Sequence, residues 1–82
     1  MTIKSFTGLV QSKDFETVSS KTGVTFTAGN SYTMQVQNDC YLKIADAVFR
    51  VSNEKFCYTA GSEDLYIKTP YGSCQLTILE ND

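Results

Sequence analysis

The sequence predicts an all-β domain, either a small sandwich or a partly open barrel, with about seven to eight short, mainly antiparallel strands. β-Branched and aromatic residues supply much of the apolar content, which suits a pleated, half-buried surface. Apolar and polar residues alternate in several segments, and no window keeps the i, i+3, i+4, i+7 spacing of an amphipathic helix. Turn-forming residues separate the segments at intervals of about 8–12 residues, as in sandwiches and barrels. The 82 residues fit one domain over positions 1–82.

The N-terminal third has the weakest alternation. Residues 3–10 fit either a strand or an extended arm, so we expect residues 1–12 to form an N-terminal arm or an edge strand. Residues 15–18 and 24–27 are rich in β-branched and aromatic residues and predict two further short strands.

The central segment predicts a hairpin over residues 31–45. Apolar side chains fall at 32, 34 and 36 and again at 40, 42 and 44, which leaves Tyr41 on the opposite face. Asn38 and Asp39 stand between the two runs, and this pair is typical of a tight turn. We therefore expect two short strands joined there.

The second half predicts four more strands. Positions 47, 49 and 51 share one face, and residues 52–54 predict a turn before a strand at 55–59. Residues 61–64 and 70–72 predict turns on either side of a strand at 65–69. Residues 73–79 alternate cleanly, as expected for a strand with one face in water.

An internal similarity links the two halves of the chain. Thr-Ala-Gly occurs at 27–29 and 59–61, and Cys-x-Leu-x-Ile follows at 40–44 and 74–78. A duplicated unit would give two hairpins that pack on each other, since one hairpin cannot bury its apolar face alone. Independent use of the same strand and turn residues would leave the same pattern.

The three cysteines, Cys40, Cys57 and Cys74, recur at a spacing of 17. There is no CxxC pair and no histidine to complete a zinc site, so we expect them to pack as small apolar residues, with a disulfide or redox role as the alternative. Their odd number argues against a secreted disulfide framework. No apolar stretch approaches a membrane span or a signal-peptide core. Synthesis and folding in a cytoplasm, with no membrane partner, are therefore expected.

The absence of histidine also excludes a Ser-His-Asp triad and an imidazole base. The acidic pairs Glu63–Asp64 and Asp14/Glu16 are interpreted as solvated loop charges, and the glycines form no phosphate-binding loop. A net charge of −2 argues against binding to a nucleic-acid backbone. These observations predict a protein that is not an enzyme and carries no cofactor or metal.

Tyrosines are the strongest candidates for a contact surface. Tyr41 and Lys43 share the outward face of their predicted strand, Tyr71 lies in a predicted turn, and Phe6 lies in the N-terminal segment. We take Tyr41, Lys43, Tyr71 and Phe6 as the candidate interface. Exposed tyrosine suits a protein interface or sugar stacking, whereas half-buried tyrosine at a core edge is the structural alternative.

Residues 56–69 (FCYTAGSEDLYIKT), together with the closing run at 76–80 (LTILE), resemble small β-rich accessory proteins of tailed-bacteriophage virions. The resemblance implies a virion structural protein, either a capsid decoration (cement) protein or an appendage module. Its partners would be other virion proteins, and a homo-oligomer, by analogy a trimer, is expected. The alternative is a carbohydrate- or receptor-binding β module that uses exposed tyrosines. The resemblance assigns no role to any single residue.

Overall fold

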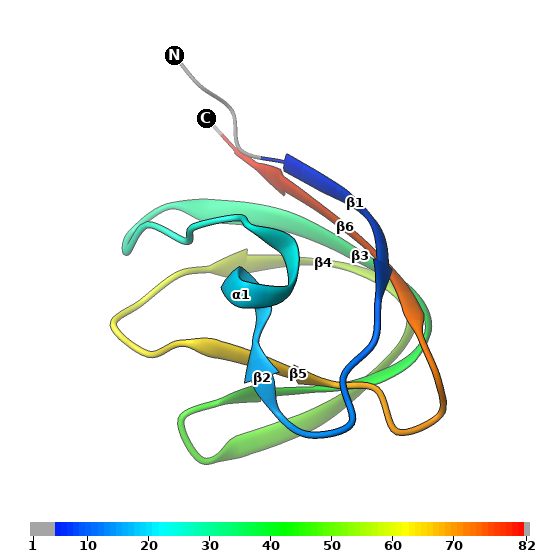
Figure 1. Ribbon diagram of the computed structural model, residues 1–82. Helices are drawn as coiled ribbons and strands as arrows, with labels where there is room; N and C mark the ends of the chain where they lie inside the picture. Colours follow the sequence, from blue (N-terminus) through cyan, green and yellow to red (C-terminus); the bar gives the residue numbers. More distant parts are fainter. Residues whose placement is uncertain (1–4, 82) are drawn as a thin grey trace.

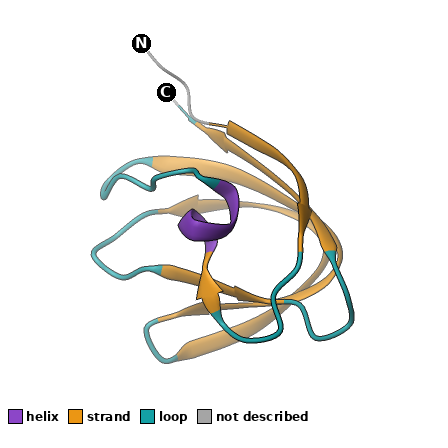
Figure 2. Ribbon diagram, in the orientation of Figure 1, coloured by secondary structure: helices purple, strands orange, loops and turns teal. Residues whose placement is uncertain are grey.

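One antiparallel sheet of six strands curls into a half-barrel in the computed structural model, which describes residues 5–81 (Figure 1). Strands make up most of the described chain, and the single short helix lies on the concave side of the sheet (Figure 2). The predicted all-β class is confirmed, in the form of a partly open barrel. The elements are β1 (Ser5–Val10), β2 (Glu16–Thr17), α1 (Val18–Thr22), β3 (Ser31–Ile44), β4 (Ala47–Thr59), β5 (Leu65–Lys68) and β6 (Cys74–Glu80).

The long strand β3 is the spine of the sheet. Along one edge it pairs with β4, and along the other it pairs with β6 through its first half and with β5 through its second half. β1 adds to β6 and β2 adds to β5, which gives the order β1-β6-β3-β5-β2 with β4 beside β3. β3 thus has β4 along one edge and two shorter strands, β6 and β5, one after the other along the opposite edge.

The sequence predicted turns at Asn38–Asp39 and at residues 52–54, and both predictions are wrong. β3 and β4 run through these positions as continuous strands. Their pairing shifts by one residue between Val36 and Asp39, so a β-bulge lies there instead. Asn38 (φ 75°) and Asn53 (φ 50°) both take left-handed backbone, which asparagine tolerates in bulges as well as in turns. Within residues 5–81 the number of strands is therefore six instead of seven or eight.

The hairpin turn between β3 and β4 lies at Ala45 and Asp46, after the predicted turn at Asn38–Asp39. Ala45 adopts φ 53°, and Ile44 pairs with Ala47 across the turn. Only two residues connect the strands, and two-residue hairpin turns need positive φ.

The expected strand at 15–18 is reduced to β2, because the chain turns into α1 at Val18. Thr17 caps the helix with its side chain, which accepts from the Ser20 backbone N–H. Gly23 ends the helix in left-handed backbone at φ 79°, and its N–H bonds to the Ser19 carbonyl. Local capping thus stops the strand after two residues.

The expected strand at 24–27 is not formed, because no neighbouring strand pairs with this segment. It packs through side chains instead. Phe26 stands edge-on to Tyr32, with ring centroids 4.8 Å apart, and to Tyr58 at 5.4 Å. The Thr27 backbone N–H donates to the Tyr32 hydroxyl at 2.7 Å. The segment therefore covers one end of the core.

The core fills the inside of the curl and follows the predicted alternation. Alternate residues of β6, and alternate residues of β3 on either side of the bulge, are fully buried, while Asn38 at the bulge is exposed and Ile44 at the end of β3 is half-buried. The fully buried residues of these two strands are Tyr32, Met34, Val36, Cys40, Leu42, Cys74, Leu76 and Ile78.

The two similar segments do not form two packed hairpins. Residues 40–44 belong to the middle of the sheet in β3, whereas residues 74–78 begin β6 after a turn. The two Thr-Ala-Gly runs do lie side by side, since the Gly29 N–H donates to the Ala60 carbonyl at 2.8 Å. The chain therefore folds as one sheet in which both Cys-x-Leu-x-Ile runs face the same core.

The cysteines fall into two environments. Cys40 and Cys74 are buried, and the hydrogen bond between their thiols, together with burial, raises the pKa of Cys40. Cys57 is exposed on β4, so the expectation that all three pack in the core is wrong for this residue. Phe56 and Tyr58, its neighbours, point inward, which leaves Cys57 on the outer face.

Candidate interaction surface

The outer face of β3, β4 and β5 carries a row of polar and aromatic side chains. Tyr41 on β3 is the register partner of Arg50 on β4 and of Lys68 on β5. Register partners in a sheet point to the same face. Since Leu42 is buried inside the curl, Tyr41 and its two partners lie on the outside. Three strands therefore present Arg50, Tyr41 and Lys68 side by side.

Tyr71 joins this row from the turn between β5 and β6. Its ring centroid lies 6.4 Å from that of Tyr41, and the two hydroxyls are 3.4 Å apart. This contact raises the pKa of Tyr41. The guanidinium of Arg50 lies 5.7 Å from the Tyr71 ring centroid. The turn is thus held against the outer face by contacts to β3 and β4, while Tyr71 stays 66% exposed.

Phe15 lies between two lysines on the same face. Lys43 Nζ is 5.5 Å from its ring centroid and Lys68 Nζ is 5.6 Å away. Both distances are within the range of cation–π attraction. Phe15 thereby holds the two ammonium groups near each other in spite of their like charge.

These contacts define an aromatic–basic patch. It contains three aromatic and three basic side chains, and it consists of Phe15, Tyr41, Lys43, Arg50, Lys68 and Tyr71.

One acidic group touches the patch. Arg50 Nη2 lies 2.5 Å from Asp39 Oδ2. A hydrogen bond from Ser52 and the contact with Arg50 lower the pKa of Asp39, so this carboxylate stays ionised at neutral pH. Asp39 balances Arg50 and leaves Lys43 and Lys68 as the surplus positive charge. A local positive surface thus exists on a chain whose net charge is −2.

The structure brings together three of the four residues expected in the interface, Tyr41, Lys43 and Tyr71. Phe6 lies apart on β1, half-buried, and it packs against the core. Phe15, Arg50 and Lys68 were missed by sequence reasoning. The alternation of residues 65–68 could have placed Lys68 outward, but Phe15 and Arg50 meet the patch only through the folded sheet.

A polar cleft of about 380 Å³ adjoins the patch at the β3–β4 bulge. Tyr71 forms part of its wall, and the other lining residues are Asn38, Asp39, Asn53 and Ser73. The Asn38 N–H donates to Asn53 Oδ1 at 3.0 Å across the bulge. The irregular pairing of the two strands therefore shapes one side of this cleft.

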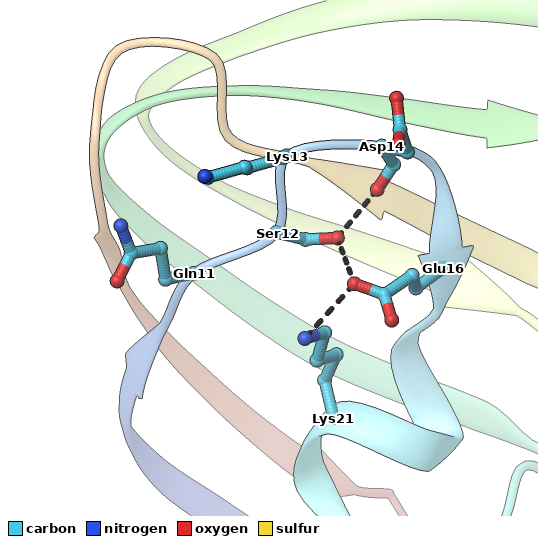
Figure 3. A pocket seen from close by; sticks show the side chains of 6 residues that line it. All are labelled: Gln11, Ser12, Lys13, Asp14, Glu16 and Lys21. Atoms are coloured by element: carbon cyan, nitrogen blue, oxygen red, sulfur yellow. Dashed lines mark hydrogen bonds and ion pairs between the residues drawn. The ribbon is translucent and has the colours of Figure 1, made fainter.

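A second depression lies where the chain passes from β1 to α1 (Figure 3). The buried Ser12 hydroxyl contacts the Asp14 carbonyl and donates to Glu16 Oε2 at 2.5 Å, and Lys21 Nζ lies 2.9 Å from the same oxygen. The Ser12 and Lys21 hydrogen bonds lower the pKa of Glu16, which makes it a poor proton acceptor for the serine. The contacts of Glu16 with Ser12 and Lys21 instead hold the loop between β1 and β2 against α1.

Ser12 also ties this loop to the end of β5. Its backbone N–H donates to Thr69 Oγ1 at 2.7 Å, and its carbonyl accepts from the Thr69 N–H at 2.7 Å. The loop that carries Phe15 is thereby anchored to β5, the strand that carries Lys68. The depression helps to position one part of the aromatic–basic patch.

Within residues 5–81, no three His, Cys, Asp or Glu side chains gather closely enough to hold a metal ion. No helix in this part of the chain is long and apolar enough to cross a membrane. Comparison with protein-family models, with curated proteins and with solved structures finds no match to this chain.

Proposed function

We propose that this chain is a non-enzymatic structural protein of a tailed-bacteriophage virion, a capsid decoration or appendage module that docks on other virion proteins. The observation that carries the proposal is the aromatic–basic patch. Aromatic residues and arginine are enriched at the centres of protein interfaces, and complementary charge orients a partner as it approaches. The virion as the setting follows from the resemblance of residues 56–69 and 76–80.

The partner surface should be acidic. Lys43 and Lys68 are the surplus charges of the patch, since Arg50 is paired with Asp39. A carboxylate on the partner can reach either ammonium while an apolar side chain packs on the adjoining rings. Phe15 keeps the two lysines in place before binding, which lowers the entropy lost on association.

Docking through this face is favoured over strand addition along β4. Although β4 has a free edge, the bulge interrupts it near Asn53. Glu54 is the register partner of the buried Val36, so a charge points to the inner side of the sheet at this edge. Bulges and inward-pointing charges are features that protect edge strands from added strands.

Self-association belongs to the same proposal, with the trimer as the expected state. The outer faces of β1 and β6 expose Leu9 (71%) and Leu79 (46%), and burial of these side chains would stabilise an oligomer. Sedimentation equilibrium measures this directly. The oligomer is contradicted if the chain stays monomeric at high concentration and Leu9→Ser behaves like the unchanged protein. Docking on virion proteins is tested separately.

Docking is tested with phage particles that lack the protein. Purified chain is added back, and the bound fraction is measured after sedimentation of the particles. Lys43→Glu/Lys68→Glu should weaken binding at least about tenfold, and added salt should weaken binding of the unchanged chain. Lys13→Glu/Lys55→Glu is the matched control, since it makes the same charge change outside the patch.

Two results would overturn the proposal. The first is absence of the protein from purified virions, combined with no rebinding to depleted particles. The second is equal loss of binding in the two double variants, which would reduce the effect to net charge alone.

A further inference from the structure

The polar cleft at the bulge is distinct from the lysine end of the patch and has its own chemistry. It lies where Asn38 and Asn53 face each other across β3 and β4 in left-handed backbone. Strained or rare backbone conformations cluster at binding sites, because the surrounding fold must stabilise them. The cleft is therefore a candidate binding site separate from the two lysines of the patch.

The lining favours an uncharged ligand with many hydroxyl groups. Two amides, one carboxylate, one aliphatic hydroxyl and one phenol offer both donors and acceptors. Asn53 uses its Oδ1 to accept from Asn38, so its NH₂ group remains available as a donor. The sole ionised side chain among the lining residues, Asp39, is already neutralised by Arg50.

Tyr71 adds a flat apolar surface to this polar lining. Arg50 and Tyr41 contact the ring from the sheet, and Tyr71 as a whole residue is nevertheless 66% exposed. A ring braced in this way loses little freedom when a ligand packs on it. The C–H face of a pyranose sugar is apolar and its rim carries hydroxyls, which matches a platform beside amides and a carboxylate.

We propose that the cleft formed by Asn38, Asp39, Asn53, Tyr71 and Ser73 binds a neutral pyranose unit, which stacks on Tyr71 and hydrogen-bonds to the polar side chains. A divalent cation fits the cleft poorly, because its lining supplies one carboxylate and that group is paired with Arg50. The assignment goes beyond docking on virion proteins and does not depend on it.

The test is a titration of the ¹⁵N-labelled protein, followed by NMR, with glucose, galactose, mannose, N-acetylglucosamine and their β-methyl glycosides. At least one of these neutral sugars should give saturable shifts in the millimolar range, centred on the amides of residues 38, 53, 71 and 73. N-acetylneuraminic acid serves as the charged comparison and should bind more weakly. Addition of a chelator should leave the shifts unchanged.

Variants locate the binding. Tyr71→Ala should weaken it at least about tenfold, whereas Tyr71→Phe should keep most of it because the ring remains. Ser73→Ala should weaken it several-fold. Val48→Ala is the matched control, since it also truncates an exposed apolar side chain but lies on β4 outside the cleft lining. The thermal unfolding of each variant is measured alongside.

The proposal is overturned if no neutral sugar gives saturable shifts, if the shifts map outside the cleft, or if binding survives Tyr71→Ala. Binding of the acidic sugar alone would also overturn it. If the cleft amides shift with the virion partner but with no sugar, the cleft is a protein contact and the saccharide assignment is wrong, while the docking proposal stands.

Discussion

The guanidinium of Arg50 lies 5.7 Å from the ring centroid of Tyr71, although the two residues belong to a strand and a turn that are not neighbours in the chain. The same guanidinium is paired with Asp39. One arginine thus joins β3, β4 and the β5–β6 turn on the outer face, and it borders both the patch and the cleft.

This arrangement predicts a specific acid dependence of stability. Hydrogen bonds from Ser52 and Arg50 lower the pKa of Asp39 in the folded state below its unfolded value. The unfolded state therefore binds the proton more readily, so the stabilisation from Asp39 is present above the unfolded pKa, near 3.9, and is lost as pH falls through the folded pKa. Asp39→Asn should reduce the fall in stability below about pH 4. Urea unfolding between pH 2 and 7 measures it, and Glu63→Gln, in the exposed β4–β5 turn, is the control. The prediction would be contradicted if stability fell equally below about pH 4 in the unchanged protein, Asp39→Asn and Glu63→Gln.

Removal of the Tyr32 hydroxyl should lower the free energy of unfolding markedly. Its hydroxyl accepts the Thr27 N–H at 2.7 Å, and the residue is fully buried. Tyr32→Phe leaves that N–H without its partner and should destabilise the fold by about 1–3 kcal/mol. Tyr71→Phe removes an exposed hydroxyl and should change stability by less than about 0.5 kcal/mol. Chemical denaturation compares the two, and similar losses in both variants would show that the Thr27 bond contributes little.

Two glycines offer a matched test of backbone conformation. A Cβ atom would meet nothing within 4 Å at either Gly23 or Gly61, but only Gly23 has left-handed backbone, at φ 79°. Gly23→Ala should therefore cost about 1 kcal/mol, and it should loosen the end of α1. Gly61→Ala should be neutral or slightly stabilising, because alanine restricts the unfolded chain. Thermal unfolding of both variants decides, and an equal response would contradict a conformational cause.

The thiols should differ sharply in reactivity. Cys57 is exposed, whereas Cys40 and Cys74 are buried. A thiol-specific chromogenic reagent should modify one cysteine rapidly in the folded protein and all three in denaturant. Cys57→Ser should abolish the rapid phase. Rapid reaction of more than one thiol in the native state would mean that the sheet opens between β3 and β6.

Local patterns predicted the parts of this fold that depend only on alternation. Tyr32, Met34 and Val36 were expected on one face and are all fully buried, because side chains of a strand alternate whatever its partners are. The turns at residues 61–64 and 70–72 were also predicted, since the residues there favour turns in any context. Strand alternation also placed Tyr41 correctly on the outer face.

Non-local pairing accounts for the wrongly predicted turns at Asn38–Asp39 and residues 52–54 and for the missing strand at 24–27. Asn38 and Asn53 tolerate left-handed backbone equally in a turn and in a bulge, and their pairing across two long strands decides between the two. Residues 24–27 have strand-forming side chains but no partner strand, so they pack as a loop beside Tyr32. A strand exists only where another backbone can bond to it.

The sequence by itself determined the all-β class, the inward set of apolar residues and the outward position of Tyr41, because each follows from composition or from the two-residue period of a strand. Tertiary structure alone brought Phe15 between Lys43 and Lys68, placed Arg50 beside Tyr71 and opened the cleft at the bulge. These contacts join segments far apart in the chain, and their distances depend on the register and curl of one sheet. No local pattern encodes that register, since it follows from how all the strands bury a shared core.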